Sequence, residues 1–427
     1  MADLTKSEMK LGVRVGSRKL RITHGRQAAF TIMDQVASGA SNLLLVLVVA
    51  KVSSTQEFGQ FSLLITSYTT GLLICRAAVG QVLVIKKASD SAMPGALGAA
   101  VAIGMLASLV IIGLSIGGVV PSMYAILALV GFPILLSQDI LRFSCFSLGK
   151  ARLALEADVI WLLGASGTAA YLLAGAQLEA SIYFVYWVSW SAISIIFMFK
   201  VARKLSRPWN LTAAWTDSRS ISSALIIEAV LTLSVLYAHI VAFGRAGGVA
   251  AIGALRGAQT LYSPVNTLVA LTTIILLPYI VPWEAQGRHA ARERLILVAA
   301  GISAVIVSFA AILSLFPGNI GAVILGPSWR SAHDLVLPIG LGVLAAALSY
   351  LPSTLLKARG RPLLLVGASI GAATVEFGSL VLGSIAGLSP RDLAFASAVG
   401  WSGGLAIWVY AAARSKFELN SNPGVVV

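Results

Sequence analysis

Long apolar runs separated by short polar segments make up most of this chain. A helix needs about 20 mostly apolar residues to cross the hydrocarbon layer of a membrane. Twelve stretches meet this length, and the first is longer than the apolar core of a signal peptide, about 7–15 residues. We therefore predict an all-α, polytopic membrane protein. The predicted spans are 28–50, 61–85, 95–117, 119–138, 157–176, 180–199, 221–243, 256–281, 295–316, 335–356, 363–386 and 392–413.

Two sequence echoes indicate that the spans form two similar halves. QEFGQFS at 56–62 resembles AAIGALR at 250–256, and KARL at 150–153 resembles KARG at 357–360. Each pair occupies the corresponding point of its half, which predicts parallel repeats related by an axis along the membrane normal. The predicted parts are a basic arm 1–27, a six-helix bundle 28–199, a basic linker 200–220, a second six-helix bundle 221–413 and a tail 414–427.

Composition excludes an ordinary soluble domain. The chain is 58% hydrophobic and 11% charged, with a mean hydropathy of +0.89, whereas soluble domains carry about 25% charged residues. The formal net charge is +14. Because the basic residues cluster between apolar runs, we attribute this charge to membrane topology and expect no nucleic-acid partner.

The distribution of Lys and Arg predicts the orientation. Of 31 such residues, 25 fall in segments on the side of the N-terminus and four on the opposite side. Cytoplasmic loops carry the excess of basic residues. We therefore expect both termini in the cytoplasm, with membrane lipids as the surroundings.

Ionisable residues within the predicted spans are the candidate functional residues, because burying charge in a membrane is costly. Arg76 and Arg256 are interpreted as cavity residues that bind an anionic substrate, or alternatively as partners of carboxylates that hold the bundle together. Arg256 could also reach the outer surface. The candidates for ion coupling or for pairing within the cavity are Asp34, Glu228, His239 and Glu376; His239 also suits a satisfied interface histidine.

Prolines within spans mark candidate hinges, since proline removes a helix hydrogen bond and kinks the axis. The candidate hinge residues are Pro133, Pro264, Pro278, Pro338 and Pro352.

Familiar catalytic motifs are absent from the sequence. It has no GxxxxGK[ST], HExxH or CxxC motif, and Cys75 and Cys145 are far apart. We predict no enzyme, no cofactor and no metal site. The longest predicted outer loop, 317–334, is shorter than a glycosyltransferase acting on lipid-linked sugar should need, although it carries Trp329, Arg330, His333 and Asp334.

Several segments resemble bacterial polysaccharide flippases of the Wzx and teichoic-acid type, within the multidrug/oligosaccharidyl-lipid/polysaccharide exporter superfamily. The similar segments are AKVSSTQEFGQFSL at 50–63, QDILRFSCFSLGKARLA at 138–154, LRGAQTLYSPVN at 255–266, LLP at 276–278 and LGPSWRSA at 325–332. They follow one another in the family's order over most of the chain.

The resemblance implies two bundles that face each other across a central cavity in a bacterial cytoplasmic membrane. It implies export of a polyprenyl-diphosphate-linked oligosaccharide or cell-wall precursor from the inner to the outer leaflet, with Arg76 and Arg256 on the diphosphate or acidic sugars. Other polysaccharide-assembly proteins are candidate partners. The two further spans usual in lipid II flippases are missing.

Three alternatives stay open. A cation-coupled exporter of small drug-like molecules predicts a cavity richer in carboxylates than in arginine. A membrane glycosyltransferase or acyltransferase predicts a concave outer site lined by His, Asp or Arg. A scaffold for cell-wall enzymes predicts a sealed, dry interior.

Overall fold

The computed structural model describes residue 27 and residues 29–81, 83, 93–174, 179–198, 211–269, 276, 280, 283, 286–359 and 361–415. Over these residues the chain is helical, as predicted. Eleven helical stretches among them are long and apolar enough to cross a membrane. Backbone polar groups in lipid must be bonded within the protein, and helices achieve this within one segment.

The N-terminal half contains the first six of these stretches. Its helices are Ala29–Val52, α2 (Thr55–Cys75), the π-helix η1 (Arg76–Gly80) that continues α2, α4 (Met93–Ile116), α5 (Ser122–Ser147), α6 (Ala151–Leu173) and α7 (Ala180–Phe197). Helix α4 packs against α5, to which the short turn 117–121 joins it, and α6 packs against α7.

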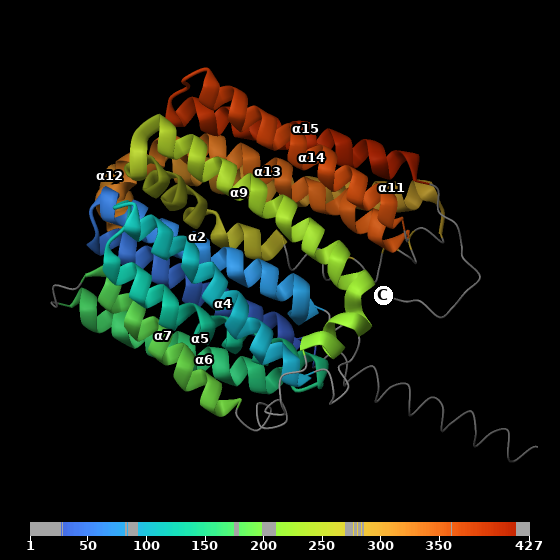
Figure 1. The fold of residues 1–427 in the computed structure, drawn as a ribbon. Coiled ribbons are helices and arrows are strands. Elements are labelled where there is room, and N and C mark those ends of the chain that lie inside the picture. Colours follow the sequence, from blue (N-terminus) through green and yellow to red (C-terminus); the bar gives the residue numbers. More distant parts are fainter. Residues whose placement is uncertain are drawn as a thin grey trace, which may run out of the picture.

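The C-terminal half contains the remaining helices. They are α9 (Leu211–Leu261), α11 (Arg288–Ser314), α12 (Gly318–Leu325), the 3₁₀ turn η2 (Gly326–Ser328), α13 (Trp329–Ala358), α14 (Pro362–Ile385) and α15 (Pro390–Arg414). Figure 1 shows the two halves as two groups of roughly parallel helices, with α9 between them.

The two ends of the helical bundle are defined by different contacts. Gln27 accepts a hydrogen bond from the backbone of Ala151, and Arg359 bonds to the backbone of Ser415. We call this the terminal end. At the opposite, distal end, the turn after Val52 meets the turn before α13, since Gly326 packs on the backbone of Lys51.

Two boundaries differ most from the sequence prediction. Helix α5 runs to Ser147 rather than to 138, and α9 begins at Leu211, inside the predicted linker 200–220. Helices keep their backbone hydrogen bonds beyond the apolar layer, so hydropathy alone predicts helices that are too short. The prediction for 1–27 lies almost wholly outside the described residues, as does much of the predicted span 256–281.

Helix α9 contains the predicted span 221–243 and the start of the predicted span 256–281. Its path breaks at Gly247 and Gly248, and Gly248 has φ of +67°. Only glycine adopts such a backbone without strain. The chain therefore reverses at the distal end, and the segment after Gly248 returns into the bundle. The start of the predicted span 256–281 therefore belongs to the same continuous stretch as the span before it, and most of the rest of that span lies outside the described residues.

The α4–α5 hairpin depends on one close backbone approach. A Cβ on Gly104 would lie 2.7 Å from the backbone nitrogen of Pro133. Ser108 also donates a hydrogen bond to the carbonyl oxygen of Ala128 across the same pair of helices, at 2.8 Å. Only a residue without a side chain lets α4 and α5 come this close.

We expect Gly104→Val to destabilise the protein by about 1–3 kcal/mol, because the two helix backbones must separate. Gly113→Val on the same helix is the control, since a Cβ there meets nothing within 4 Å. Thermal unfolding in detergent should show a lower midpoint for the first variant only. Equal midpoints for the two variants would contradict the close packing.

Candidate functional site

A buried group of charged side chains lies in the N-terminal half, centred on Arg142 of α5. Its guanidinium bonds to Asp34 on the first helix and lies 3.0 Å from an oxygen of Asp139, one turn earlier on α5. Its Nε lies 3.0 Å from Asp158 on α6, at ion-pair distance but not aligned for a hydrogen bond. Arg142 and these three carboxylates are all at most 3% exposed. We call this group the N-half network.

Arg76 joins the network from the end of α2. Its Nε and Nη2 donate to the two oxygens of Asp139, at 2.8 and 2.7 Å. This two-point geometry is the strong form of an arginine–carboxylate pair. The side chain of Arg76 is nevertheless 27% exposed, with its guanidinium carbon 5.8 Å from the Phe143 ring centre. Arg76 thus lies at the edge of the N-half network, whereas Arg142 lies at its centre.

The position of Arg76 follows from a local change of helix type. Residues 76–80 form a π-helix at the end of α2. Single turns of this kind occur frequently at functional sites. A Cβ on Gly80, the last residue of this turn, would lie 3.1 Å from the Phe143 ring. The small residue therefore lets the π-turn pack closely against α5.

The network differs from the sequence prediction in two ways. Arg76 pairs with Asp139, not with Asp34 or Glu376, and Asp34 pairs with Arg142 instead. Arg142 falls between the predicted spans 119–138 and 157–176, but it lies within α5 and is buried. Its charge is matched by residues far along the chain, which hydropathy cannot detect. The sequence did contain one signal of this pairing: Asp139 and Arg142 are spaced one helical turn apart.

The charges of the network do not cancel. Three carboxylates, Asp34, Asp139 and Asp158, face two guanidiniums, so the fully ionised group carries one net negative charge. Gln138 donates a hydrogen bond to Asp158 at 2.7 Å, whereas one oxygen of Asp34 has no hydrogen-bond partner among the described residues. Buried charges are stable only when paired. A proton or a cation would balance the remaining charge.

Arg256 on α9 has a different environment. It lies in the returning segment, where the neighbouring Gly253 packs on α2 and Gly257 packs on α13. Its Nε is buried without a hydrogen-bond partner, and Arg256 forms no ion pair in the part of the chain that the structure describes. Arg256 is therefore a half-buried guanidinium between the halves that lacks a described carboxylate.

The ionisable candidates of the C-terminal half are only partly connected. His239 of α9 donates from Nδ1 to the carbonyl oxygen of Val235 at 2.9 Å and accepts at Nε2 from Ser397 of α15 at 2.8 Å. This favours its interpretation as a satisfied interface histidine. Glu376 of α14 is 3% exposed, and its Oε1 has no hydrogen-bond partner among the described residues. The side chain of Glu228 lies outside the described residues.

The candidate hinges stay a prediction. Pro133 lies inside α5, while Pro338 and Pro352 lie inside α13. Pro264 lies in the short helical stretch after α9, and Pro278 is outside the described residues. The sharpest backbone break within the described helices falls at Gly247 and Gly248.

The halves meet at the distal end through glycines. A Cβ on Gly59 of α2 would lie 2.1 Å from the carbonyl oxygen of Val249, and a Cβ on Gly253 would lie 2.8 Å from that of Thr55. Gly326 similarly touches Lys51. Gly59 and Gly253 occupy the same position of the two echoed segments at 56–62 and 250–256. We call these contacts the distal glycine contact; they hold the halves backbone to backbone.

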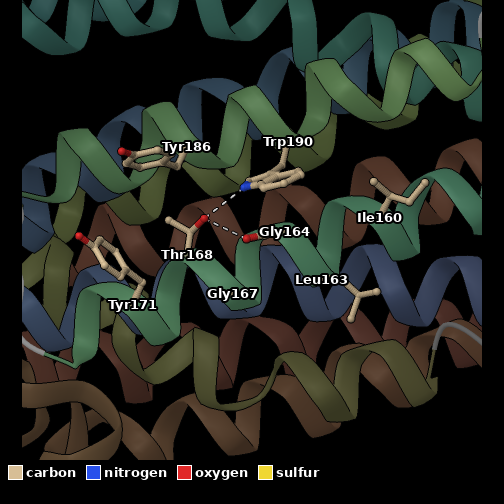
Figure 2. A pocket seen from close by; sticks show the side chains of 8 residues that line it. All are labelled: Ile160, Leu163, Gly164, Gly167, Thr168, Tyr171, Tyr186 and Trp190. Atoms are coloured by element: carbon tan, nitrogen blue, oxygen red, sulfur yellow. Dashed lines mark hydrogen bonds between the residues drawn. The ribbon is translucent and has the colours of Figure 1, made fainter.

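A shallow groove of about 600 Å³ lies between α6 and α7 (Figure 2). Trp190 donates a hydrogen bond to the Thr168 hydroxyl, which donates to the carbonyl oxygen of Gly164. The indole of Trp190 occupies the space where a side chain at residue 164 would lie. The groove is lined by no charged group within the described residues, and these polar atoms bond to one another, so it presents an apolar surface to surrounding lipid.

The distal end does have a concave polar site. A pocket between α12 and the start of α13 is lined by Arg330, His333 and Asp334 among other residues. The glycosyltransferase alternative predicted an outer site with this type of lining. Because the distal surface carries such a site, the glycosyltransferase alternative stays open.

Comparison with known proteins identifies the fold. No protein-family model and no curated protein sequence matches the chain. Solved structures of MOP-superfamily transporters match over nearly its whole length. The chain therefore has the fold of this class of membrane proteins.

The similar structures are distant in sequence. An inward-facing multidrug resistance MATE family transporter has 12% identity over 91% of this chain and 98% of its own, with a TM-score of 0.66. The lipid II flippase MurJ in an inward closed conformation has 12% identity over 90% of this chain and 86% of its own, with a TM-score of 0.66. An outward-facing MATE family transporter has 11% identity over 92% and 95%, with a TM-score of 0.59.

We expect Arg142→Gln to cost about 3–5 kcal/mol of stability, because three buried carboxylates lose their shared partner. Arg152→Gln is the control: it breaks an exposed ion pair with Glu156, which is worth less than about 1 kcal/mol. Thermal unfolding in detergent measures both. Adding Asp158→Asn to the first variant should recover part of the loss, and no recovery would contradict the charge count of the network.

We expect Gly253→Val to open the distal end, because the new side chain cannot fit against the α2 backbone. Ser53, which is 4% exposed at this end, reports the change when it is replaced by Cys. Its alkylation by a water-soluble maleimide should be at least about tenfold faster with Gly253→Val than without it. Gly301→Val, where a Cβ meets nothing within 4 Å, should leave the rate unchanged. Equal rates in all three proteins would contradict a closed distal contact.

Proposed function

We propose that this protein is a flippase or exporter that moves a polyprenyl-diphosphate-linked oligosaccharide or cell-wall precursor across a bacterial cytoplasmic membrane by alternating access. The observation that carries the proposal is Arg256, a half-buried guanidinium between the halves without a described carboxylate partner. A buried cation needs a counter-charge or water. A diphosphate that passes between the halves supplies the counter-charge.

The arrangement of the halves supports alternating access. The halves touch at the distal end through the distal glycine contact. With both termini in the cytoplasm, as the basic residues predict, the distal end faces outward. The cargo headgroup then enters from the cytoplasmic side, with its lipid tail in the bilayer. Separation of the distal glycine contact releases the headgroup on the other side.

Two arginines have separate roles in this proposal. Arg76 is bonded through two nitrogens to Asp139, so only its exposed part is available to an acidic sugar. Arg256 has no such partner within the described residues and takes the diphosphate, where charge-assisted bonds are strong. Glu376, buried without a described cation, is the candidate for proton coupling.

A cation-coupled exporter of small molecules is the second candidate. The N-half network favours it, because it brings together three carboxylates that the sequence does not show as a cluster. The same carboxylates are largely neutralised by Arg142 and Arg76, so they leave a surplus of one charge rather than an acidic cavity. One surplus negative charge is suited to binding a coupling cation, but it gives no preference for a positively charged cargo.

We expect Arg256→Gln to slow translocation of a fluorescent lipid-linked oligosaccharide in proteoliposomes about tenfold or more, since one charge-assisted contact is lost. Arg245→Gln, an exposed arginine on the same helix, is the control and should retain the wild-type rate. Wild-type rates for both variants at equal incorporation would remove the main support of the proposal. Efflux of cationic dyes by the wild type, without oligosaccharide translocation, would favour the second candidate.

The cargo itself can be identified in cells. Depletion of the protein should cause a lipid-linked glycan to accumulate on the cytoplasmic side, and analysis of extracted lipids names it. An unchanged glycolipid profile after depletion would argue against the flippase proposal.

A further inference from the structure

The pocket at the distal end is not used by the proposed transport path. It lies between α12, η2 and the first turn of α13, within the C-terminal half alone, and has a volume of about 780 Å³. This volume falls in the range of small-molecule sites, about 300–1,000 Å³. Figure 1 places α12 at the end of the bundle where the distal turns gather.

The pocket wall is built by tight packing. The indole of Trp329 occupies the space beside Gly321, where a Cβ would lie 1.8 Å from the ring. The same indole packs near Phe316 and over His333, with ring centres 6.5 and 4.9 Å apart. Gly326 enters the turn with φ of +56° and rests on the backbone of Lys51. The pocket therefore has a fixed shape.

The polar groups of the pocket come from one face of α13. Arg330 and Asp334 are exposed, and neither forms an ion pair within the described residues although they are one turn apart. His333 donates from Nε2 to the carbonyl oxygen of Ser314 at 3.2 Å, because a carbonyl only accepts. This bond fixes the ring orientation and leaves Nδ1 to accept from a ligand.

We propose that this pocket binds the phosphate-bearing headgroup of a lipid at the distal face of the membrane. The Arg330 guanidinium takes the phosphate, for which planar paired donors are suited. The Asp334 carboxylate and His333 Nδ1 accept hydroxyl groups of the glycerol or sugar next to the phosphate. Trp329 lies beside them at the depth where tryptophan is enriched in membrane proteins, the interface with water.

The location agrees with this ligand. Helix α13 begins at Trp329 and its apolar part follows directly, so the first turn lies at the edge of the hydrocarbon layer. Lipid phosphates lie at this depth. The small residues Gly318 and Ala322 of α12 line the opposite wall, which leaves room for a headgroup while the lipid tails stay in the bilayer. The site does not require Arg256 or any particular cargo.

Two lipids could supply the phosphate: an ordinary phospholipid of the leaflet or the polyprenyl carrier of the proposed cargo. The full chain in detergent micelles is titrated with phosphatidylglycerol, with farnesyl phosphate and with diacylglycerol, which has hydroxyl but no phosphate. Native mass spectrometry counts the bound lipids. The wild type should retain at least one phosphate lipid in preference to diacylglycerol.

Variants of the pocket test the assignment. Arg330→Gln should weaken phosphate-lipid binding about tenfold, because one charge-assisted contact is lost. Asp334→Asn should strengthen binding of farnesyl phosphate, because it removes a negative charge beside the phosphate. Farnesyl phosphate has no hydroxyl next to its phosphate, so it loses no hydrogen bond to the carboxylate. Arg391→Gln, an exposed arginine at the same end on α15, should bind as the wild type does.

These outcomes distinguish the two possible lipids from each other, and both from the failure of the proposal. Retention of phosphatidylglycerol alone assigns the site to leaflet phospholipid, and retention of farnesyl phosphate alone assigns it to the carrier. Equal binding by the wild type and by Arg330→Gln, or an equal loss in Arg330→Gln and Arg391→Gln, would overturn the site. Neither result depends on translocation, which is measured separately in proteoliposomes.

Discussion

The free-energy cost of burying a guanidinium among membrane helices determines which side chains must surround each buried arginine of this protein. Such a group needs a carboxylate, a chain of hydrogen bonds or water. Arg142 meets the need fully, since three carboxylates surround it. Arg76 meets it through one carboxylate and stays partly exposed. Arg256 has no described partner. The three arginines therefore form a series from the most paired to one without a described partner.

This series connects packing to function. The N-half network joins the first helix, the end of α2, α5 and α6, so it ties these four helices of the N-terminal half together. The contact between the halves is of another kind, because at the distal end glycines lie against backbone atoms. Buried apolar side chains of both halves, such as Phe58 and Leu255, belong to one core cluster, so opening this end also exposes apolar surface. Alternating access requires this contact to separate.

The sequence predicted the helices well and the site only in part. The limits of α14 and α15 came within about three residues of the predicted spans, because apolar length is a local property. The echoed glycines also pointed to the two halves, but not to the fact that Gly59 and Gly253 touch. The network could not be predicted, since Arg142 counts as a loop charge until Asp34 and Asp158 are placed beside it. Arg76 was assigned to a cavity, and its partner Asp139 was missed for the same reason.

The most direct test of the account is a pair of distances measured by double electron–electron resonance in nanodiscs. One pair of spin labels replaces Lys51 and Arg391 at the distal end, and the other replaces Arg152 and Arg414 at the terminal end; all four residues are exposed. When a polyprenyl-diphosphate oligosaccharide is added, the distal distance should lengthen while the terminal distance shortens. Distances that stay fixed, or that change in the same direction at both ends, would contradict alternating access between the two halves.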